Sequence, residues 1–526
     1  MSLVWPAGEP APVSLDFYGR APQSASRDVY LPHFRGVSPI GGGFILEDHI
    51  NEVGYLSVMV PGLVKGLHRL HHTYGRKAWS EVVLPAAEAA ENGVRVPEET
   101  YRSWVKETTA GFLPARDKLV HTEESRRIFT KDGELYQPGE LILQRDYANT
   151  LREIAETGTR SFYHGRSAEA IAADFARNGG LMAADDLAEL AVTHPDPLIG
   201  SIPGIRRLHQ PAAGWRPPGV RDPECPGELR SVQPAALGSS GCTLLIQAMW
   251  LAFEDRRRHH GDPEFIHVPV DRLASKAYAA ELADAIDLDA QTLDLEHGDE
   301  PAMPEEPTET CVVSVADAEG NAVSITHTLG SASGVVTPGL GFTYNNSMHL
   351  FDPRPGSPNS LEPRKRRITG MAPTIVSKEG KPFLIVGAPG GTRIITAIVH
   401  TIVNIVDHGM SPGEAVSAPR FHAENGLVFM EPRCYYAVAS ELERLGYGDI
   451  TMVPSSFDPM LGRATLVRVD PGGNIREDPI RGAGAVWSRV GYRIGLPRSY
   501  SMPRRRARAG CAQAKGRSAG LPGGGL

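Results

Sequence analysis

The stretch TETCVVSVADAEGN, residues 308–321, decides how the chain folds around it. An alternating apolar run, 311–316, leads into an acidic turn, 317–321, and a second strand-like run, 322–328, follows at once. Two such runs joined by a short turn that contains Asp and Gly predict a β-hairpin. The preceding residues, 288–309, are rich in Asp, Glu and Pro, so we expect a mobile surface linker that ends where Thr310 opens the hairpin.

The predicted secondary structure differs on the two sides of this hairpin. Upstream, apolar residues recur at helical spacing, and the helical stretches are 60–70, 167–176, 243–260 and 269–287. Downstream, short apolar runs predict strands at 374–376 and 383–387, and a longer one predicts a helix over 394–406. The sequence therefore predicts a helix-rich first part and a strand-rich second part, with the Pro- and Gly-rich residues 196–241 as a loop.

Composition argues against several classes of protein. The 526 residues carry a net charge of −8, and no sustained basic face precedes residue 500, so nucleic-acid binding is not expected. The five cysteines lack metal-ligand spacing, so we expect no disulfide framework, no metal and no cofactor. No apolar run approaches the roughly 18 residues that cross a bilayer, and no signal peptide begins the chain. On these grounds we expect a cytoplasmic location without a membrane partner.

Thr310 has two interpretations. A β-branched residue is favoured in a strand, and as a strand residue Thr310 needs no further explanation. Alternatively, a cut between Glu309 and Thr310 would give Thr310 a free α-amine beside its own hydroxyl. Such an amine has a pKa of about 7.7–8.0 and can act as a general base near neutral pH. An exposed acidic stretch directly before a rigid hairpin is the arrangement that this cut requires.

Two further features could contribute chemistry. In GAPGGTRI, residues 387–394, Gly390 and Gly391 lie between a predicted strand and a predicted helix, where backbone N–H groups can stabilise an oxyanion. The alternative is an ordinary tight turn. Arg27, in SASRDVYL, is a further candidate, although a lone Arg is usually a solvated surface residue. The GSSG at 238–241 does not fit the nucleophile elbow of serine hydrolases.

Together these segments resemble the γ-glutamyltranspeptidase family of N-terminal nucleophile hydrolases. The pattern T-x-x-x-S-V-x-D-x-x-G-N of that family fits residues 310–321, and the resemblance extends over about residues 12–486. The remaining matching segments are THTL at 326–329, NNSM at 345–348, MAPTIV at 371–376, GAPGGTRII at 387–395, APRFH at 418–422, and upstream DFYGRAP, SRDVYL, VPGLVKGL, NGGLMAADDLAEL and GDPEFIHVP.

The resemblance implies a role for each matching position. Thr310 would be the nucleophile that self-cleavage at Glu309–Thr310 exposes, and Thr328 would orient it. Gly390 and Gly391 would form the oxyanion hole. The substrate-binding positions would be Arg27 and Thr369, which would hold a carboxylate, together with Gly370, Gly330 and Ser347.

The resemblance also implies an overall organisation. The fold would be α+β, a four-layer αββα sandwich. Residues 1–309 would correspond to a large subunit and 310–486 to a small subunit, and the two would stay associated after cleavage. Residues 487–526, with the basic run 504–508 and a Gly-rich end, would form a disordered tail. Such a zymogen takes part in glutathione metabolism in this family and uses no cofactor.

Several positions depart from the family pattern. Gly330 replaces the usual Asn, Ser347 the usual Gln, Leu350 the usual Asp, and Thr369-Gly370 the usual Ser-Ser. The groups that hold an α-ammonium are therefore absent, while the carboxylate-binding Arg27 remains. We expect a small-molecule amide substrate whose acyl group carries a carboxylate.

The ends of the chain depart from the pattern as well. The helix and Gly-rich strand with which the family begins have no counterpart before Met1, and the residues after 486 match no family segment. A truncated start, with which an export signal would have been lost, and a frameshifted end are both expected on this comparison.

These departures leave alternatives open. The first is a self-cleaving acyl hydrolase or acyltransferase that releases its acyl group to water or an amine. A variant of it is an amidohydrolase for dicarboxylic monoamides of the oxamate or glutaryl type. The second is an uncleaved, inactive homologue that binds small carboxylates or a protein partner.

Overall fold

The hairpin predicted from residues 311–328 is present. Its strands are β11 (Cys311–Ala316) and β12 (Ala322–His327), paired in antiparallel register. Asp317 closes the turn, because its Oδ1 accepts hydrogen bonds from the N–H groups of Glu319 and Asn321. Gly320 adopts φ +98°, a conformation that favours glycine. The Asx- and Gly-containing turn therefore forms for the reason that the sequence suggested.

The structure is a computed structural model that describes residues 1–37, 43–106, 112–202, 205–209, 238–291, 293, 310–448, 450–470 and 475–476. Residues Met1–Ala485 form one compact unit. The predictions of a mobile linker before Thr310 and of a disordered tail fall almost wholly on residues outside the described ranges.

Helices account for much of the first part of the chain, as predicted. Their bounds are α1 Arg27–Tyr30, α2 Leu63–Tyr74, α3 Trp79–Asn92, α4 Glu98–Val105, α5 Ala115–Leu119, α6 Glu123–Phe129, α7 Arg145–Thr157, α8 Arg160–His164, α9 Arg166–Arg177, α10 Ala184–Glu189, α11 Ser239–His259, α12 Val270–Leu273, α13 Lys276–Asp284, α14 Arg393–Val406, α15 Pro412–Ser417 and α16 Pro432–Arg444. The mixture of helices and strands makes the fold α+β, in agreement with the sequence analysis.

Two sheets carry the site, and both combine strands from before and after Thr310. The four-stranded sheet has the order β11-β12-β1-β2, where β1 is Ser2–Trp5 and β2 is Val13–Leu15. The six-stranded sheet has the order β19-β18-β14-β13-β10-β9, and its strands are β9 Leu198–Ile202, β10 Ile205–His209, β13 Thr374–Lys378, β14 Lys381–Gly387, β18 Thr465–Val469 and β19 Ile475–Arg476. The remaining strands form smaller sheets: β3 Phe34–Val37, β4 Phe44–Leu46, β5 Val94–Arg95, β6 Thr130–Lys131, β7 Glu134–Leu135, β8 Leu141–Ile142, β15 Phe421–Glu424, β16 Leu427–Met430 and β17 Ile450–Met452.

This sheet composition corrects two predictions. The stretch 196–241, predicted as a loop, contains the hairpin β9–β10, which pairs with β13 at one edge of the six-stranded sheet. The division into a helix-rich first part and a strand-rich second part is also wrong in this respect, because β1 and β2 complete the four-stranded sheet. Both errors have one cause: short strands of three to five residues carry too few alternations to reveal a period.

Alternating side chains fill the space on both faces of the six-stranded sheet. Ile375 and Ile385 pack against Leu3 and Trp5 of β1, so one face meets the four-stranded sheet. Their neighbours Val376, Leu384 and Val386 point the other way and pack against Ile394, Ala397 and Ile398 of α14. This is the two-residue period of a strand that is buried on both faces.

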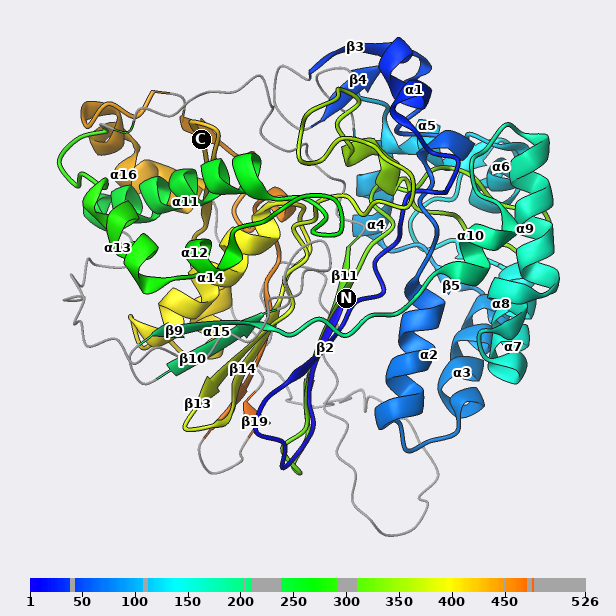
Figure 1. Cartoon of the computed structure of the whole chain (residues 1–526), viewed down its shortest axis with the longest axis horizontal. Coiled ribbons are helices and arrows are strands. Elements are labelled where there is room, and N and C mark those ends of the chain that lie inside the picture. The colour runs from blue at the N-terminus through cyan, green and yellow to red at the C-terminus, as the bar shows by residue number, and fades with distance from the viewer. Residues whose placement is uncertain are drawn as a thin grey trace, which may run out of the picture. The chain divides into compact units, whose positions relative to one another are not determined.

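The outer face of the four-stranded sheet packs against α2. Leu63 and Leu70 of α2 contact Val4, Leu15 and Phe17. A Cβ at Gly66 would lie 2.0 Å from the Phe17 ring, so glycine permits this close approach. In Figure 1, α2, α3, α7 and α9 lie on one side of the strands, and α11, α14 and α16 lie on the other.

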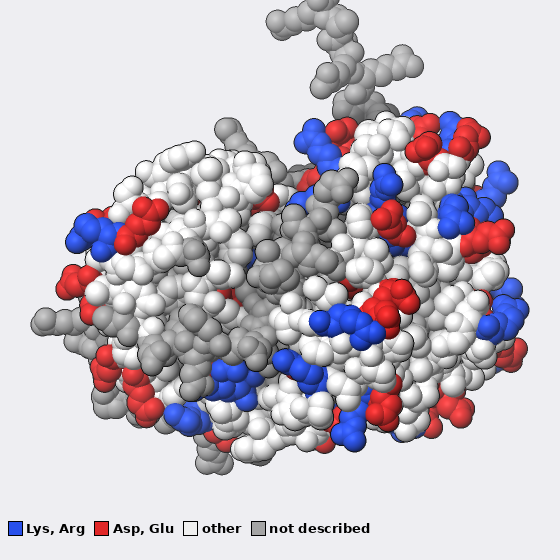
Figure 2. Space-filling model, turned by 90° about the horizontal axis from the view of Figure 1, so that it is seen from above, with Lys and Arg blue, Asp and Glu red and all other residues white. Residues whose placement is uncertain are grey.

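The surface carries charges of both signs. On the face seen in Figure 2, Lys and Arg side chains alternate with Asp and Glu side chains and gather into no continuous basic patch. Over the described residues, none of the helices is both long enough and apolar enough to cross a lipid bilayer.

Candidate active site

Thr310 lies directly before β11, beside the end of β12. The register of the hairpin sets Cys311 opposite His327, which brings the neighbouring residues Thr310 and Thr328 together. The Thr310 hydroxyl donates a hydrogen bond to Thr328 Oγ1 at 3.0 Å. Thr328 Oγ1 also accepts the Gly330 N–H at 2.9 Å, which fixes its orientation. Thr310 is only 6% exposed.

The Gly390-Gly391 turn lies at the same end of the two sheets. β14 ends at Gly387, where an added Cβ would be 2.5 Å from Val312 Cγ1, so this end of β14 meets the first residues of β11. Gly390 (φ +131°) and Gly391 (φ +60°) then turn the chain into α14. Because the first N–H groups of a helix have no partner within the helix, this turn can present them to an anionic oxygen.

Thr369 and Gly370 pack against this turn. A Cβ at Gly370 would lie 2.2 Å from the carbonyl oxygen of Gly391, so only glycine fits there. Thr369 is 2% exposed, and its Oγ1 accepts the Met371 N–H at 3.1 Å. A serine at position 370 could therefore not be accommodated without moving Gly391.

A buried hydrogen-bond network supports the turn from behind. Thr392, the next residue after Gly391, donates its hydroxyl to Glu424 Oε2 at 2.7 Å, and His422 Nε2 lies 3.1 Å from the same oxygen. Burial raises the pKa of Glu424, but the hydrogen bond and charge of His422, with Arg256, hold the net pKa below its ordinary value. Glu424 is therefore a carboxylate at neutral pH and a strong acceptor for the Thr392 hydroxyl.

Gly330 is constrained by its neighbours. It has φ +68°, and an added Cβ would lie 2.3 Å from Asn346 Oδ1. That oxygen already accepts the Ser331 N–H at 2.9 Å, so Asn346 occupies the space that a side chain at position 330 would need. The absence of the usual Asn at position 330 is thus built into the packing of the loop.

A pocket opens beside Thr328, and it is mostly apolar. Ser347, Met371 and His327 line it together with Phe17, Met59 and Val60. Burial, and next the Met1 ammonium, lower the pKa of His327, so its imidazole is neutral at physiological pH.

The remaining departure, Leu350, is buried and faces a second cavity shared with Phe44 and Phe253. Beside it, His349 is fully buried, and burial followed by the Arg367 charge lowers its pKa to about 3. Leu350 and the neutral His349 themselves offer no charge to an ammonium group, although Asp352 and Glu424 also line this cavity.

Sequence reasoning missed an ion pair beneath Gly330. Lys118 Nζ lies 2.9 Å from Glu52 Oε2 and donates to Ser331 Oγ at 3.1 Å, and both charged side chains are at most 5% exposed. Asn346 Nδ2 donates to the same Ser331 oxygen at 2.6 Å. No local pattern could reveal this pair, because its members are far apart in sequence and neither lies in a matching segment.

Arg27 lies apart from these groups. Its side chain is 62% exposed at the first residue of α1, with Asp28 at 4.0 Å, and it is not among the residues that line the pocket beside Thr328. Glu309 lies outside the described residues. Over the described ranges, His, Cys, Asp and Glu side chains form no cluster of three or more that could hold a metal ion.

The chain is similar to known proteins over most of its length. The family model described as gamma-glutamyltranspeptidase matches residues 1–488. The glutathione hydrolase proenzyme of Escherichia coli (strain K12) is 33% identical over 432 residues, which cover 78% of this chain and 70% of that protein. The Acylase ACY 1 proenzyme of Pseudomonas sp. (strain SE83) is 35% identical over 446 residues, which cover 83% of this chain and 76% of that protein.

A solved structure agrees with these relatives. The cephalosporin acylase from Bacillus halodurans superimposes with a TM-score of 0.74 at 26% identity, covering 90% of this chain and 83% of that one. The similarity therefore extends over most of both chains.

Proposed function

Because the chain belongs to the γ-glutamyltranspeptidase family of self-processing acyl hydrolases and acyltransferases, we propose that it cuts itself between Glu309 and Thr310 and uses Thr310 as its nucleophile. The contact of Thr310 Oγ1 with Thr328 Oγ1 at 3.0 Å carries this proposal. Because Thr310 lies at the start of a rigid hairpin, cleavage would hold its new α-amine close to its side-chain hydroxyl.

The chemistry follows from these groups. The α-amine of Thr310 takes the hydroxyl proton, and Oγ1 attacks the carbonyl carbon of the amide. The N–H groups of Gly390 and Gly391 stabilise the oxyanion that develops. The leaving amine receives the proton and departs, which leaves an ester on Thr310. Water or an amine then attacks this ester and releases the acyl group.

The two products of the cut, 1–309 and 310–526, remain associated in this proposal through the first of them and residues 310–486 of the second. Both sheets support it: β1 of the first segment pairs with β12 of the second, and β10 of the first pairs with β13 of the second. Separating the segments would break both sheets and expose the apolar core between them. We further propose that α2, the two sheets and α14 represent the four layers of an αββα sandwich, supported by the packing described above.

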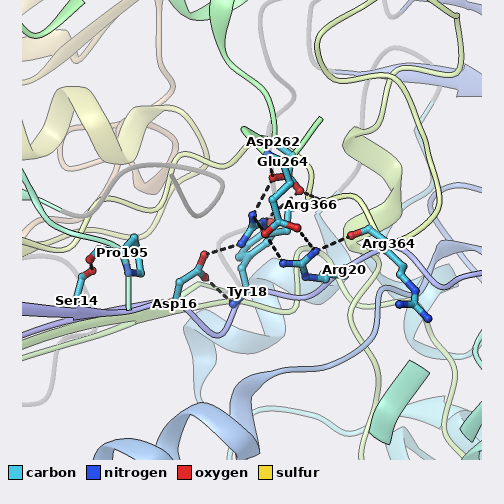
Figure 3. Close-up of polar contacts among 9 residues, drawn as sticks. All are labelled: Ser14, Asp16, Tyr18, Arg20, Pro195, Asp262, Glu264, Arg364 and Arg366. Atoms are coloured by element: carbon cyan, nitrogen blue, oxygen red, sulfur yellow. Dashed lines mark hydrogen bonds and ion pairs between the residues drawn. The ribbon is translucent and has the colours of Figure 1, made fainter. Parts of the chain in front are cut away.

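An ion-pair cluster adds a second link between the segments (Figure 3). Arg366, from the second segment, is 3% exposed and contacts Asp262 at 2.8 Å, Glu264 at 2.6 Å and Asp16 at 3.5 Å. Arg20 contacts Glu264 at 2.7 Å. All partners of Arg366 in this cluster belong to the first segment.

The proposed acyl group carries a carboxylate but no α-ammonium, as in a glutaryl amide or oxamate. Gly330, Ser347 and Leu350 offer an ammonium no charged partner, and leaving an ammonium unpaired in a partly desolvated site costs several kcal/mol. Arg27 and Thr369 are the proposed carboxylate ligands, and the guanidinium of Arg27 is accessible to a carboxylate from solvent.

Denaturing gel electrophoresis with N-terminal sequencing tests the cut. Dividing 56.8 kDa in proportion to 309 and 217 residues gives fragments of roughly 33 and 23 kDa, the smaller beginning at Thr310. Thr310→Ala should abolish both cleavage and activity, while Thr310→Ser keeps a hydroxyl and should retain slower cleavage. A folded wild-type protein that stays at full length for days would favour the uncleaved, inactive homologue instead.

The acyl class is tested separately on cleaved protein, by comparing kcat/KM for matched glutaryl and γ-glutamyl anilides. We expect the glutaryl compound to be preferred by a hundredfold or more. Arg27→Ala should lower kcat/KM for both compounds, because both carry the carboxylate, whereas Arg35→Ala, a change of another exposed arginine, should lower neither. A tenfold preference for the γ-glutamyl compound would show that positions 330, 347 and 350 do not set specificity.

A further inference from the structure

Two buried cysteines lie in contact in the core between α11 and α16. Cys242 is in the first turn of α11 and Cys434 in the first turn of α16. Both thiols are free, they hydrogen-bond each other, and neither residue is more than 1% exposed. Around them the core is apolar, with Ile246, Val438 and Leu442 as neighbours in the same cluster.

Packing alone does not account for this contact. Any small apolar side chain would fill either position in such a core, yet two of the three described cysteines meet there, from helices on either side of Thr310 in the sequence. Thiols that already touch need only small side-chain rotations to reach the geometry of a disulfide. The third described cysteine, Cys311, is exposed and stands apart from this pair.

We propose that Cys242 and Cys434 are a disulfide site that links segment 1–309 covalently to segment 310–486. The oxidant is a low-molecular-weight disulfide, R–S–S–R. The Cys434 thiolate attacks one of its sulfurs and releases R–S⁻, which leaves a mixed disulfide. Cys242 sulfur then attacks Cys434 sulfur and releases the second R–S⁻. The two thiol protons end on the released thiols, and two electrons pass to the oxidant.

The same scheme holds with the two sulfurs exchanged, so the disulfide that forms does not depend on which thiol reacts first. Because both thiols are buried, the oxidant reaches them when the start of α16 opens locally.

The consequence for the two segments rests on the proposed cut at Glu309–Thr310. Before the cut, the disulfide closes a loop within one chain. After it, the disulfide is the only covalent connection between the two fragments among the described cysteines, and it holds them together when every sheet has melted.

The test counts thiols and does not depend on cleavage. Native protein is incubated with excess 2-hydroxyethyl disulfide, denatured with iodoacetamide present, and weighed intact. We expect the other three of the five cysteines to carry either an alkyl group or a mixed disulfide with the reagent, and Cys242 and Cys434 to carry neither and to appear as a linked peptide pair, whereas all five are alkylated after reduction. Cys311→Ser should keep the link, and Cys242→Ser and Cys434→Ser should each abolish it. Alkylation of all five cysteines in the wild type, or linkage of either residue to a different cysteine, would overturn the proposal.

Gel electrophoresis separates this result from the self-cleavage. On a non-reducing gel the oxidised, cleaved protein should run as one band near 57 kDa, and on a reducing gel as bands of roughly 33 and 23 kDa. If the chain is not cleaved, both gels show one full-length band, and the thiol count still decides the disulfide.

Discussion

The direction of the Thr310 hydroxyl depends on a second threonine. Thr328 Oγ1 accepts hydrogen bonds from the Thr310 hydroxyl and the Gly330 N–H. The loop that follows β12 therefore sets the orientation of Thr328 Oγ1. The loop in turn is fixed where Asn346 accepts the Ser331 N–H. An attacking oxygen held in this way needs little reorientation before reaction.

Replacing Thr328 should therefore slow the reaction without unfolding the protein. We expect Thr328→Val, which keeps the shape and removes the hydroxyl, to lower kcat by about 10²-fold, because misdirected reacting groups lose rate steeply. Thr328→Ser keeps the hydroxyl and should retain most of the activity. The measurement is kcat and KM on cleaved protein at one pH, and equal kcat for both variants would contradict the role of the hydroxyl.

Glu424 holds the Gly390-Gly391 turn through Thr392, so under the proposed mechanism it is a positioning residue. We expect Glu424→Gln and Thr392→Val each to lower kcat by roughly tenfold with KM little changed, because the turn that holds Gly391 loses its anchor. Thr392→Ser should restore the rate. Glu443→Gln, a change of an exposed glutamate, is the control and should leave kcat unaltered. A rise in KM with unchanged kcat would place Glu424 in substrate binding instead.

At the scale of elements, α14 carries its own response to pH. His400 lies on its buried face and shares a hydrogen bond with the Phe421 carbonyl at 2.9 Å. Burial favours the neutral imidazole and lowers the pKa of His400 to about 4, against about 6.5 in the unfolded chain. Between these two values the unfolded chain binds the additional proton, so acid destabilises the fold there.

The free energy of unfolding should therefore fall as pH decreases from 6.5 to 4, by up to about 1.4 kcal/mol per pH unit from His400. Urea unfolding at a series of pH values measures this slope. His400→Gln keeps a donor for the Phe421 carbonyl and should flatten the slope, whereas the exposed His72→Gln should not change it. An equal slope in wild type and His400→Gln would assign the acid sensitivity to other groups.

An element can be predicted from sequence when the residues that determine it are local, and cannot when it depends on pairing with a distant segment. The hairpin β11–β12 and α14 were predictable, because the turn residues at 317–321 and the long apolar run 394–406 are local signals. The hairpin β9–β10 was not, since its strands are defined by pairing with β13, more than 160 residues away in sequence. For the same reason the Thr310–Thr328 pair could be expected from one hairpin, whereas Lys118–Glu52 and Thr392–Glu424 exist only once distant segments have packed.

At the scale of the whole molecule, Arg366 joins the two segments. It faces Asp262, Asp16 and Glu264, and the first two carboxylates are at most 2% exposed. Removal of the guanidinium would leave buried carboxylates without a counter-charge, which typically costs 3–5 kcal/mol.

Arg366→Ala should accordingly lower the midpoint of urea unfolding and release the fragments of cleaved, reduced protein at lower urea concentration. The neighbouring Arg364→Ala is the matched control, because its side chain is 52% exposed and pairs with Glu189 at the surface. Size-exclusion chromatography across a urea series reports the dissociation. If both variants dissociate at the same urea concentration, the buried ion-pair cluster does not contribute to fragment association.

Because each main sheet contains strands from both segments, folding should precede the proposed cleavage. A chain that folds first and is cut afterwards brings its strands together as parts of one molecule, at an effective concentration in the millimolar range. Halves synthesised separately would meet only by collision, and each would carry hairpins such as β1–β2 without the strands that they pair with. Assembly of such halves would be second order and would fail on dilution. If the chain is cut as proposed, the peptide bond before Thr310 is thus a temporary tether that assembly needs and the assembled protein does not.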